Sequence, residues 1–401
     1  MSQAYIIDGV RTPIGNFGGT LSTMRSDDLA AYVIAELVKR NPQIPVENIA
    51  DVMLGCVNQA GEDNRNVARM ALLLAGLPFS VPGETVNRLC ASSMSAMIQA
   101  TRGIQSGDGD VFIAGGVENM TRSPWVMSKA SKAFGTDAQM FDSSFGWRFI
   151  NPKLDHIYGT EAMGKTAENL VEMYGISRED QDLFAYNSQI KAAKAQQSGR
   201  FAEEIIPLSI SIKKGETSVL SADEFIKPST SLEKLATLKP AFKKDGSVTA
   251  GNASGLNDGA IAVYMASENA VKQYNLTPKA RIVASAVVGV EPRIMGIGPV
   301  PATQLALKKA GLTLKDIDII ELNEAFAAQS LACIRQLGLA DNDPRINPNG
   351  GAIALGHPLG MSGARITYSA ALELQKQNKR YALATMCIGV GQGYAVIIER
   401  V

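Results

Sequence analysis

Short apolar runs alternate along the chain with longer stretches in which apolar residues recur at helical spacing. Two of the apolar runs, residues 5–9 and 280–289, are each followed by a turn that contains a proline and then by an amphipathic stretch, at 27–40 and 301–310. Apolar runs of this length that end in turn residues are typical of buried strands. The alternation of such strands with helices predicts an α/β fold.

The same order of elements occurs twice along the chain. Residues 49–55 and 317–322 are two further apolar runs, and an asparagine follows each of them, Asn58 after the first and Asn323 after the second. A spaced recurrence of this kind indicates an internal repeat.

Cys90 and His357 hold equivalent places in this repeat. A Met-Ser pair stands four residues after each of them, at the start of a helical stretch, and an apolar run follows each helix, at 110–116 and 381–387. Ligands of open α/β sheets bind where strands give way to helices. We therefore expect Cys90 and His357 to meet at one site, related by a pseudo-dyad.

The repeat divides the chain into two predicted halves, residues 1–270 and 271–401. Residues 121–251 interrupt the first half with a different composition, aromatic-rich at 141–158, helical at 166–198 and rich in lysine thereafter. We expect this segment to form an inserted loop domain.

Composition and charge limit the class of protein. With 401 residues and 46% hydrophobic content, the chain can bury a large core. Lys+Arg and Asp+Glu both total 39, so the net charge of zero gives no reason to expect nucleic acid or a membrane surface as a partner. The chain opens directly on a strand and has no run of membrane-spanning length, so we expect a cytoplasmic protein.

The cysteines and histidines argue against a metal site. Four cysteines are spread over the chain without a CxxC pair, and there are only two histidines. This spacing fits neither a disulfide framework nor a zinc site. We expect no bound metal.

Small residues surround Cys90, His357 and Cys387. A free cysteine is by itself more often a small core residue than a nucleophile. The glycines beside His357 and Cys387 favour a functional reading, because glycine permits close backbone approach and exposed N–H groups can stabilise an oxyanion. The three residues together indicate acyl transfer through a thiolate.

The glycines at 389–393 do not predict a dinucleotide site. A dinucleotide-binding glycine loop opens a helix, whereas here a strand-like run follows at 394–398.

Five motifs, taken in their order, resemble the thiolase family, and the match extends nearly from end to end. They are Val86-Asn87-Arg88-Leu89-Cys90, Gly251-Asn252-Ala253-Ser254-Gly255, Asn323-Glu324-Ala325-Phe326, Gly356-His357-Pro358 and Cys387-Ile388-Gly389-Val390-Gly391-Gln392-Gly393. The resemblance implies a thiolase fold, with two similar βαβαβαββ halves in a five-layered core and a loop domain inserted in the first half.

The resemblance also implies the catalytic roles. Cys90 would take the acyl group, and His357 would deprotonate Cys90 and then, with a water held by Asn323, stabilise a thioester enolate. Cys387 would move a proton between the acetyl-CoA carbon and the incoming CoA thiol. The backbone N–H groups of Cys90 and Gly389 would bind the oxyanion of the acyl-enzyme.

Glu324 is an alternative acid, although a carboxylate beside Asn323 could equally anchor His357 or its loop.

Coenzyme A would be a co-substrate, with no tightly bound cofactor. By resemblance, its pantetheine would lie along Ala250, Ser254 and Met163. The walls would be Phe242, Ala325 and Phe326, and Lys227 would lie near the nucleotide end. For the methionine and the two phenylalanines, ordinary core packing is the alternative. Members of the family are dimers or tetramers, so we expect a homodimer or a homotetramer.

Two departures from the family pattern bear on the substrate. Ala91 and Ser93 replace glycines after the nucleophile and would narrow the pocket or slow the enzyme. Ala162 stands where members specific for acetoacetyl-CoA often carry histidine. Acetoacetyl-CoA is therefore a less natural substrate.

Residues 59–66 and 141–152 are similar to the branch that cleaves 3-oxoadipyl-CoA. Such a substrate has a distal carboxylate, which a bidentate arginine binds well. Arg148 or Lys153 could supply that cation, and a surface role is the alternative for either.

Three other functions are weighed against this one. An acetoacetyl-CoA or general 3-ketoacyl-CoA thiolase would keep the same chemistry. A ketoacyl synthase would lack the thiol of Cys387. A non-catalytic CoA-binding relative would lose Cys90, His357 or Cys387, and all three are present.

Overall fold

A single ten-stranded sheet forms the centre of the computed structural model, which describes residues 2–213 and 216–401. Its middle strands are β1 (Ala4–Arg11) and β11 (Ala280–Gly289), which lie antiparallel to each other. The strands on the β1 side are, in order, β10 (Asn257–Ser267), β5 (Val111–Asn119), β3 (Asp51–Gly55) and β4 (Gly83–Val86), with β2 (Gly15–Asn16) paired to β10. Those on the β11 side are β14 (Gln392–Arg400), β13 (Tyr381–Ile388) and β12 (Ile319–Leu322).

The two sides of the sheet repeat one pattern. On each side, two antiparallel pairings come first and a parallel pairing follows, β5 with β3 and β13 with β12. A parallel bridge from Ile320 to Ile346 stands where β3 pairs with β4 on the other side. The predicted internal repeat is confirmed.

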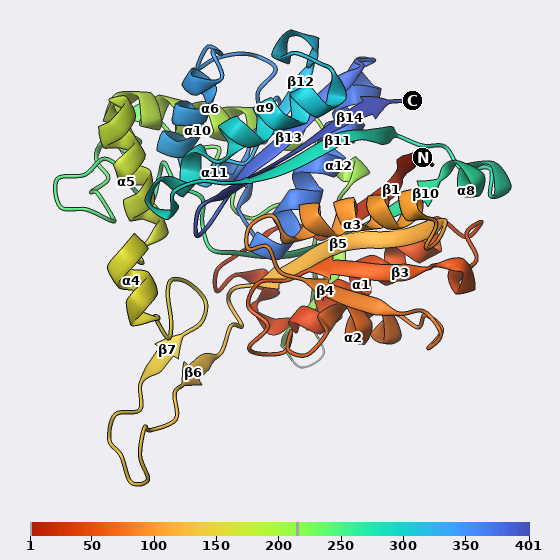
Figure 1. Cartoon of the computed structure of the whole chain (residues 1–401), viewed down its shortest axis with the longest axis horizontal. Helices are drawn as coiled ribbons and strands as arrows, with labels where there is room; N and C mark the ends of the chain where they lie inside the picture. The colour runs from red at the N-terminus through yellow and green to blue at the C-terminus, as the bar shows by residue number, and fades with distance from the viewer. Residues whose placement is uncertain (1, 214–215) are drawn as a thin grey trace.

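Helices complete five layers (Figure 1). The helices α3 (Ser92–Ser106) and α12 (Leu359–Gln377) pack against each other, and α12 contacts strands of both sides of the sheet. On the outer face of the β1-side strands lie α1 (Ser26–Arg40) and α2 (Val67–Leu74). On the outer face of the β11-side strands lie α9 (Pro299–Ala310) and α10 (Ala327–Gln336). Two short helices of the halves are α8 (Glu268–Gln273) and α11 (Ala352–Leu355).

Local sequence explains where these helices begin and end. The first turn of α1 carries Asp27 and Asp28 and its last turn carries Lys39 and Arg40, which matches the helix dipole at both ends. The central helix α3 ends at Gly107, whose φ of 85° is favourable only for glycine.

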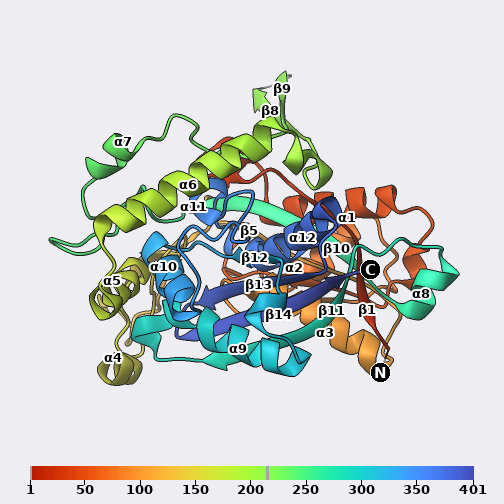
Figure 2. The ribbon, with the colours of Figure 1, turned by 90° about the horizontal axis from the view of Figure 1, so that it is seen from above.

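The segment between β5 and β10 forms the inserted domain. It contains β6 (Trp125–Met127), β7 (Met140–Asp142), α4 (Pro152–Tyr158), α5 (Met163–Tyr174), α6 (Arg178–Gln197), β8 (Leu208–Lys213), β9 (Glu216–Leu220) and α7 (Leu232–Ala236). The β6–β7 hairpin extends away from the body (Figure 1), and α6 crosses the second half of the molecule (Figure 2). The stretch predicted as helical at 166–198 is divided into two helices, because Gly175 ends α5 in a left-handed turn and Ser177 caps α6.

Buried ion pairs fasten the insertion to the sheet. Arg11 of β1 is fully buried and binds Asp223 (Nη1–Oδ1 2.7 Å) and Glu204 (Nη2–Oε1 3.4 Å). Removing one partner of such a cluster would leave a buried charge uncompensated. These ion pairs therefore fix the position of the insertion relative to the sheet. Among the described residues, no helix is both long and apolar enough to cross a membrane.

Candidate active site

Two cavities meet at Cys90. The first has a volume of about 420 Å³ and the second about 320 Å³. The residues that line both are Cys90, Met120, Phe145, Met163, Leu359 and Gly389. His357 and Cys387 line the first cavity, so the three residues singled out in the sequence are brought together, from both halves of the chain.

Cys90 lies in the tight turn between β4 and α3. The turn is closed by hydrogen bonds from Ala91 N–H to Arg88 O (3.1 Å) and from Ser92 N–H to Leu89 O (3.0 Å). Burial raises the pKa of the Cys90 thiol to about 11, although the N–H groups of Gly389 and of Cys90 itself favour the thiolate. At neutral pH the resting thiol is protonated and needs a base.

His357 is held as a neutral imidazole. It is buried, and burial, with a smaller contribution from Arg365, lowers its pKa to about 3. The Nδ1 atom lies 2.6 Å from Ser362 Oγ, whose hydroxyl donates to Pro358 O at 2.8 Å. Ser362 Oγ therefore accepts a hydrogen bond from the Nδ1–H group, and this assigns the lone pair to Nε2.

Asn323 supports the same tautomer. Its Nδ2 lies 3.3 Å from His357 Nε2 and donates to the lone pair there. Asn323 is fully buried in the turn after β12, and its Oδ1 has no hydrogen-bond partner among the described residues. A buried polar atom without a partner marks a place for water or substrate.

Cys387 lies near the end of β13, with 1% of its surface exposed. Burial raises its pKa well above the ordinary thiol value, and the sulfurs of Cys90 and Cys333 raise it further. Cys387 is therefore a thiol at rest, able to give a proton to a stronger base.

Glu324 anchors the loop that leads to His357. Its carboxylate accepts from Ser188 Oγ (2.6 Å), Asn347 Nδ2 (2.7 Å) and the N–H of Ile353 (3.2 Å). It is not among the residues that line either cavity at Cys90. The geometry favours the anchoring role over the acid.

The remaining residues expected around CoA all line the first cavity. They are Ala250, Ser254, Met163, Phe242, Ala325, Phe326 and Lys227. Phe242 and Phe326 meet edge to face with ring centroids 6.1 Å apart. Lys227 Nζ lies 4.7 Å from the centre of the Phe225 ring, where the cavity opens toward a third cavity of about 320 Å³ that Lys227, Lys234 and Ala250 also line.

Arg148 lines the second cavity, together with Trp147 and Ala162. Within residues 2–213 and 216–401, no hydrogen bond or ion pair engages its guanidinium. Lys153 is exposed on α4 and does not line this cavity. Of the two predicted cations, only Arg148 faces the space beside Cys90.

The expected narrowing by Ala91 and Ser93 is wrong. Both residues are fully buried, and neither lines either cavity at Cys90. Ser93 Oγ instead accepts the N–H of Ala364 at 2.9 Å and joins α3 to α12.

Comparison with known proteins decides the family. The model of the thiolase N-terminal domain matches residues 4–269 and that of the C-terminal domain matches residues 276–400. The chain belongs to the thiolase family. This thiolase is an acyltransferase, as the fold and the match over both domains indicate.

Curated relatives resemble the thiolase over their full length. It is 60% identical over 401 residues, 100% of both chains, to the 3-oxoadipyl-CoA/3-oxo-5,6-dehydrosuberyl-CoA thiolase of Escherichia coli strain K12. It is 58% identical, again over 100% of both chains, to a beta-ketoadipyl-CoA thiolase of Acinetobacter baylyi. Human mitochondrial 3-ketoacyl-CoA thiolase in complex with CoA is 41% identical with a TM-score of 0.92, covering 100% of this thiolase and 98% of the human chain.

Sequence reasoning missed two polar residues of the thiolase site. Ser362 was noticed only as part of the repeat, yet it orients His357. Glu118, at the end of β5, is buried and lines the second cavity. The sequence could have indicated Glu118, because it is an acidic residue at the end of the apolar run that begins at 110. Ligand sites lie at the carboxyl ends of parallel strands.

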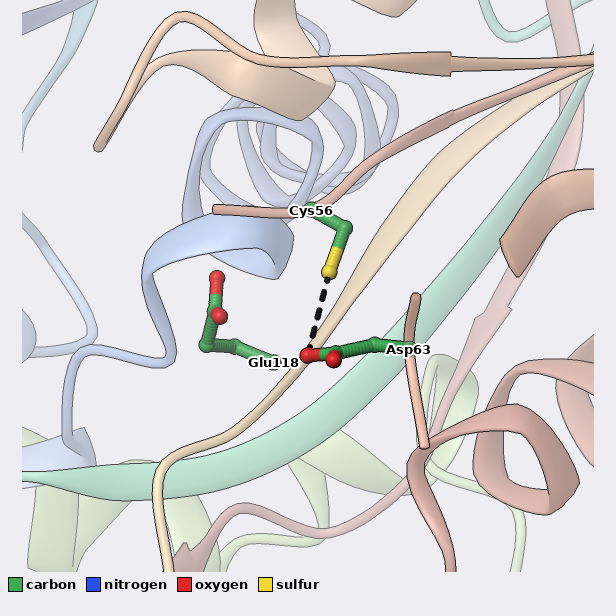
Figure 3. A group of neighbouring side chains, drawn as sticks. All are labelled: Cys56, Asp63 and Glu118. Carbon is green, nitrogen blue, oxygen red and sulfur yellow. Dashed lines mark hydrogen bonds between the residues drawn. The ribbon is translucent and has the colours of Figure 1, made fainter. Parts of the chain in front are cut away.

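Cys56, Asp63 and Glu118 form the group most like a metal site in the described part of the thiolase. Figure 3 shows the Cys56 thiol directed at Asp63 (Sγ–Oδ2 3.6 Å). The Glu118 carboxyl accepts the N–H groups of Val57 (3.1 Å), Asn58 (3.1 Å) and Gly360 (2.8 Å). Hydrogen bonds account for the whole arrangement, which joins the loop after β3 to the start of α12.

Proposed function

We propose that this thiolase cleaves 3-oxoadipyl-CoA with CoA, giving acetyl-CoA and succinyl-CoA, and that it catalyses the reverse Claisen condensation as well. The observation that carries the proposal is the guanidinium of Arg148 in the cavity beside the nucleophile, which has no ion-pair partner among the described residues. The relatives from Escherichia coli and Acinetobacter baylyi named above support the same substrate.

The two cavities divide the substrate between them. The CoA moiety occupies the first cavity, whose mainly apolar lining suits pantetheine, and the diphosphate end reaches the lysines of the third cavity. The acyl chain occupies the second cavity, so its distal carboxylate reaches Arg148. A planar guanidinium binds a carboxylate through two parallel hydrogen bonds.

The first chemical step acylates Cys90. As Cys90 Sγ attacks the 3-oxo carbon, His357 Nε2 takes the thiol proton. Its lone pair can accept the proton because Nδ1 carries the other one, and the proton displaces the hydrogen bond from Asn323 Nδ2. The bond between C2 and C3 then breaks, and the electrons pass to the thioester as an enolate.

The enolate needs both a positive charge and an acid. Protonated His357, with a water held by Asn323, stabilises the enolate oxygen. The thiol of Cys387 gives its proton to C2, which releases acetyl-CoA and leaves Cys387 as a thiolate.

Deacylation reverses the proton transfers. The incoming CoA gives its thiol proton to Cys387 and attacks the acyl-Cys90 thioester. The N–H groups of Cys90 and Gly389, which already approach the Cys90 sulfur, bind the oxyanion. Cys90 leaves with the proton that His357 had taken.

Arg148→Ala tests the substrate. The variant should raise KM for 3-oxoadipyl-CoA by about thirtyfold and change acetoacetyl-CoA cleavage little, because a charge-assisted hydrogen bond contributes about 2 kcal/mol. Lys153→Ala, which removes a nearby exposed lysine, is the matched control and should leave both substrates unaffected. Equal losses on both substrates in Arg148→Ala would show that Arg148 supports the loop or CoA instead.

We also propose that the thiolase is a homodimer or a homotetramer. Strand β4 is an edge of the sheet, and exposed Leu73, Leu74 and Phe79 lie close to it in the chain. An open edge beside an apolar surface favours pairing with a second copy. Light scattering at micromolar concentration should give the mass of at least a dimer, and a monomer would refute this proposal.

A further inference from the structure

Val390 has a backbone conformation that its side chain disfavours. It is the middle residue of the three-residue turn between β13 and β14, which the Ile388–Gln392 pair closes. Its φ is 62°, in the left-handed region. A β-branched residue is a genuine outlier there, and glycine is the usual choice in such turns.

Packing does not compensate for this conformation. The side chain of Val390 is 41% exposed, so its burial returns little stability. The next residue, Gly391, shows what the turn itself requires, since a Cβ there would lie 2.2 Å from Val290 O. At position 390, by contrast, no packing contact among the described residues explains why the turn carries a valine rather than a glycine. Unfavourable backbone conformations without a structural reason are concentrated at functional sites.

The side chain lies between two spaces. Val390 lines the second cavity and also a small crevice on the other side, which Glu161, Pro292 and Arg293 line. Only Trp147 and Met163 share both linings with it in the described part of the chain. Val390, Trp147 and Met163 thus form a partition, and Val390 is its smallest member.

We propose that Val390 determines the acyl-chain specificity of the thiolase by closing the second cavity against this crevice. The inference rests on the proposed function, because it takes the second cavity as the acyl site. With the partition intact, the cavity is closed off from the crevice, has Arg148 in its lining and suits a short chain with a terminal carboxylate. Without the valine side chain, the cavity would extend into the crevice and admit longer apolar chains.

Val390→Gly tests the inference because it should keep or improve stability while it weakens the discrimination against longer acyl chains. The variant removes the unfavourable conformation, so Tm should stay unchanged or rise. The ratio of kcat/KM for 3-oxodecanoyl-CoA to that for 3-oxoadipyl-CoA should rise by about tenfold, in the range known for pockets that discriminate by size. Val390→Ala, with part of the partition removed, should give an intermediate ratio.

Asn275→Gly is the matched control. Asn275 is exposed, has a φ of 50° and lies just after α8, outside the residues that line either cavity. This variant also replaces a side chain with glycine at a left-handed position, but outside the acyl site, and should leave the substrate ratio unchanged.

Three results would overturn the inference. They are a ratio within twofold of the wild-type value, an equal loss on every substrate, and a fall in Tm of several degrees in Val390→Gly. The second would mean that Val390 positions the N–H of Gly389, and the third that it is a packing residue. The wild-type preference tests the proposed function separately, because the inference depends only on how the ratio changes between wild type and variant.

Discussion

Cys90 and His357 rest as an uncharged pair. With pKa values of about 11 and about 3, the thiol keeps its proton and the imidazole stays neutral throughout the physiological range. Charge therefore develops only when substrate is attacked, in a site with fixed N–H donors. The low basicity of free His357 is a consequence of burial, and a bound substrate oxygen that becomes negative would raise it.

Because Cys90 is the proposed nucleophile and Cys387 the proposed acid, replacing Cys387 should impair only part of the reaction. Cys387→Ala should still accept an acyl group on Cys90 from a simple acyl-CoA, because acylation uses His357 as the base. It should fail in carbon–carbon cleavage and condensation, which need a second acid. Mass spectrometry should locate the adduct on Cys90, with Cys90→Ala as the unlabelled control. Near wild-type condensation by Cys387→Ala would refute its role.

The lowered pKa of His357 also predicts an acid-dependent loss of stability. The unfolded chain binds a proton at this residue below pH 6.5, whereas the folded chain does so only near pH 3. Stability is therefore lost as pH falls from 6.5 toward 3, by about 2 kcal/mol at pH 5. His357→Asn should lack this loss.

Urea unfolding of both proteins at pH 7.5 and pH 5 measures the difference. The free energy of unfolding of the wild type should fall by about 2 kcal/mol more than that of His357→Asn. Parallel changes in the two proteins would contradict the neutral, buried state of His357.

At the scale of elements, the site is made from turns that follow strands. Cys90 precedes α3, His357 precedes α12, Asn323 follows β12 and Gly389 follows β13. These turns come from both halves and meet because α3 and α12 pack against each other. The internal repeat in the hydrophobic pattern was sufficient to predict that Cys90 and His357 would lie together.

Hydrogen bonds between segments far apart in the chain could not be predicted from the sequence. The carboxyl of Glu118 reaches Gly360, which is 242 residues away, and nothing local to either residue indicates that bond. The break at Gly175 was missed for a different reason, since a glycine inside a helical pattern is often tolerated. The burial of Ser93 away from the cavities depends on how closely α12 approaches α3, which the sequence does not show.

At the scale of the molecule, the halves and the insertion have different tasks. The halves supply the cysteines and the histidine, and the insertion supplies Arg148, Met163 and much of the wall for CoA. Changes in the insertion can thus alter the substrate specificity while the catalytic residues stay the same. The boundary near residue 270, the limits 121–251 and the cytoplasmic location stay predictions.

The preference of the wild-type enzyme tests the whole account most directly. Thiolysis by the purified protein should be measured with CoA and three substrates: 3-oxoadipyl-CoA, acetoacetyl-CoA and a medium-chain 3-ketoacyl-CoA. We predict the highest kcat/KM for 3-oxoadipyl-CoA, because the second cavity places Arg148 where the distal carboxylate would lie. A higher kcat/KM for either monocarboxylic substrate would contradict the assignment of the second cavity as a carboxylate site.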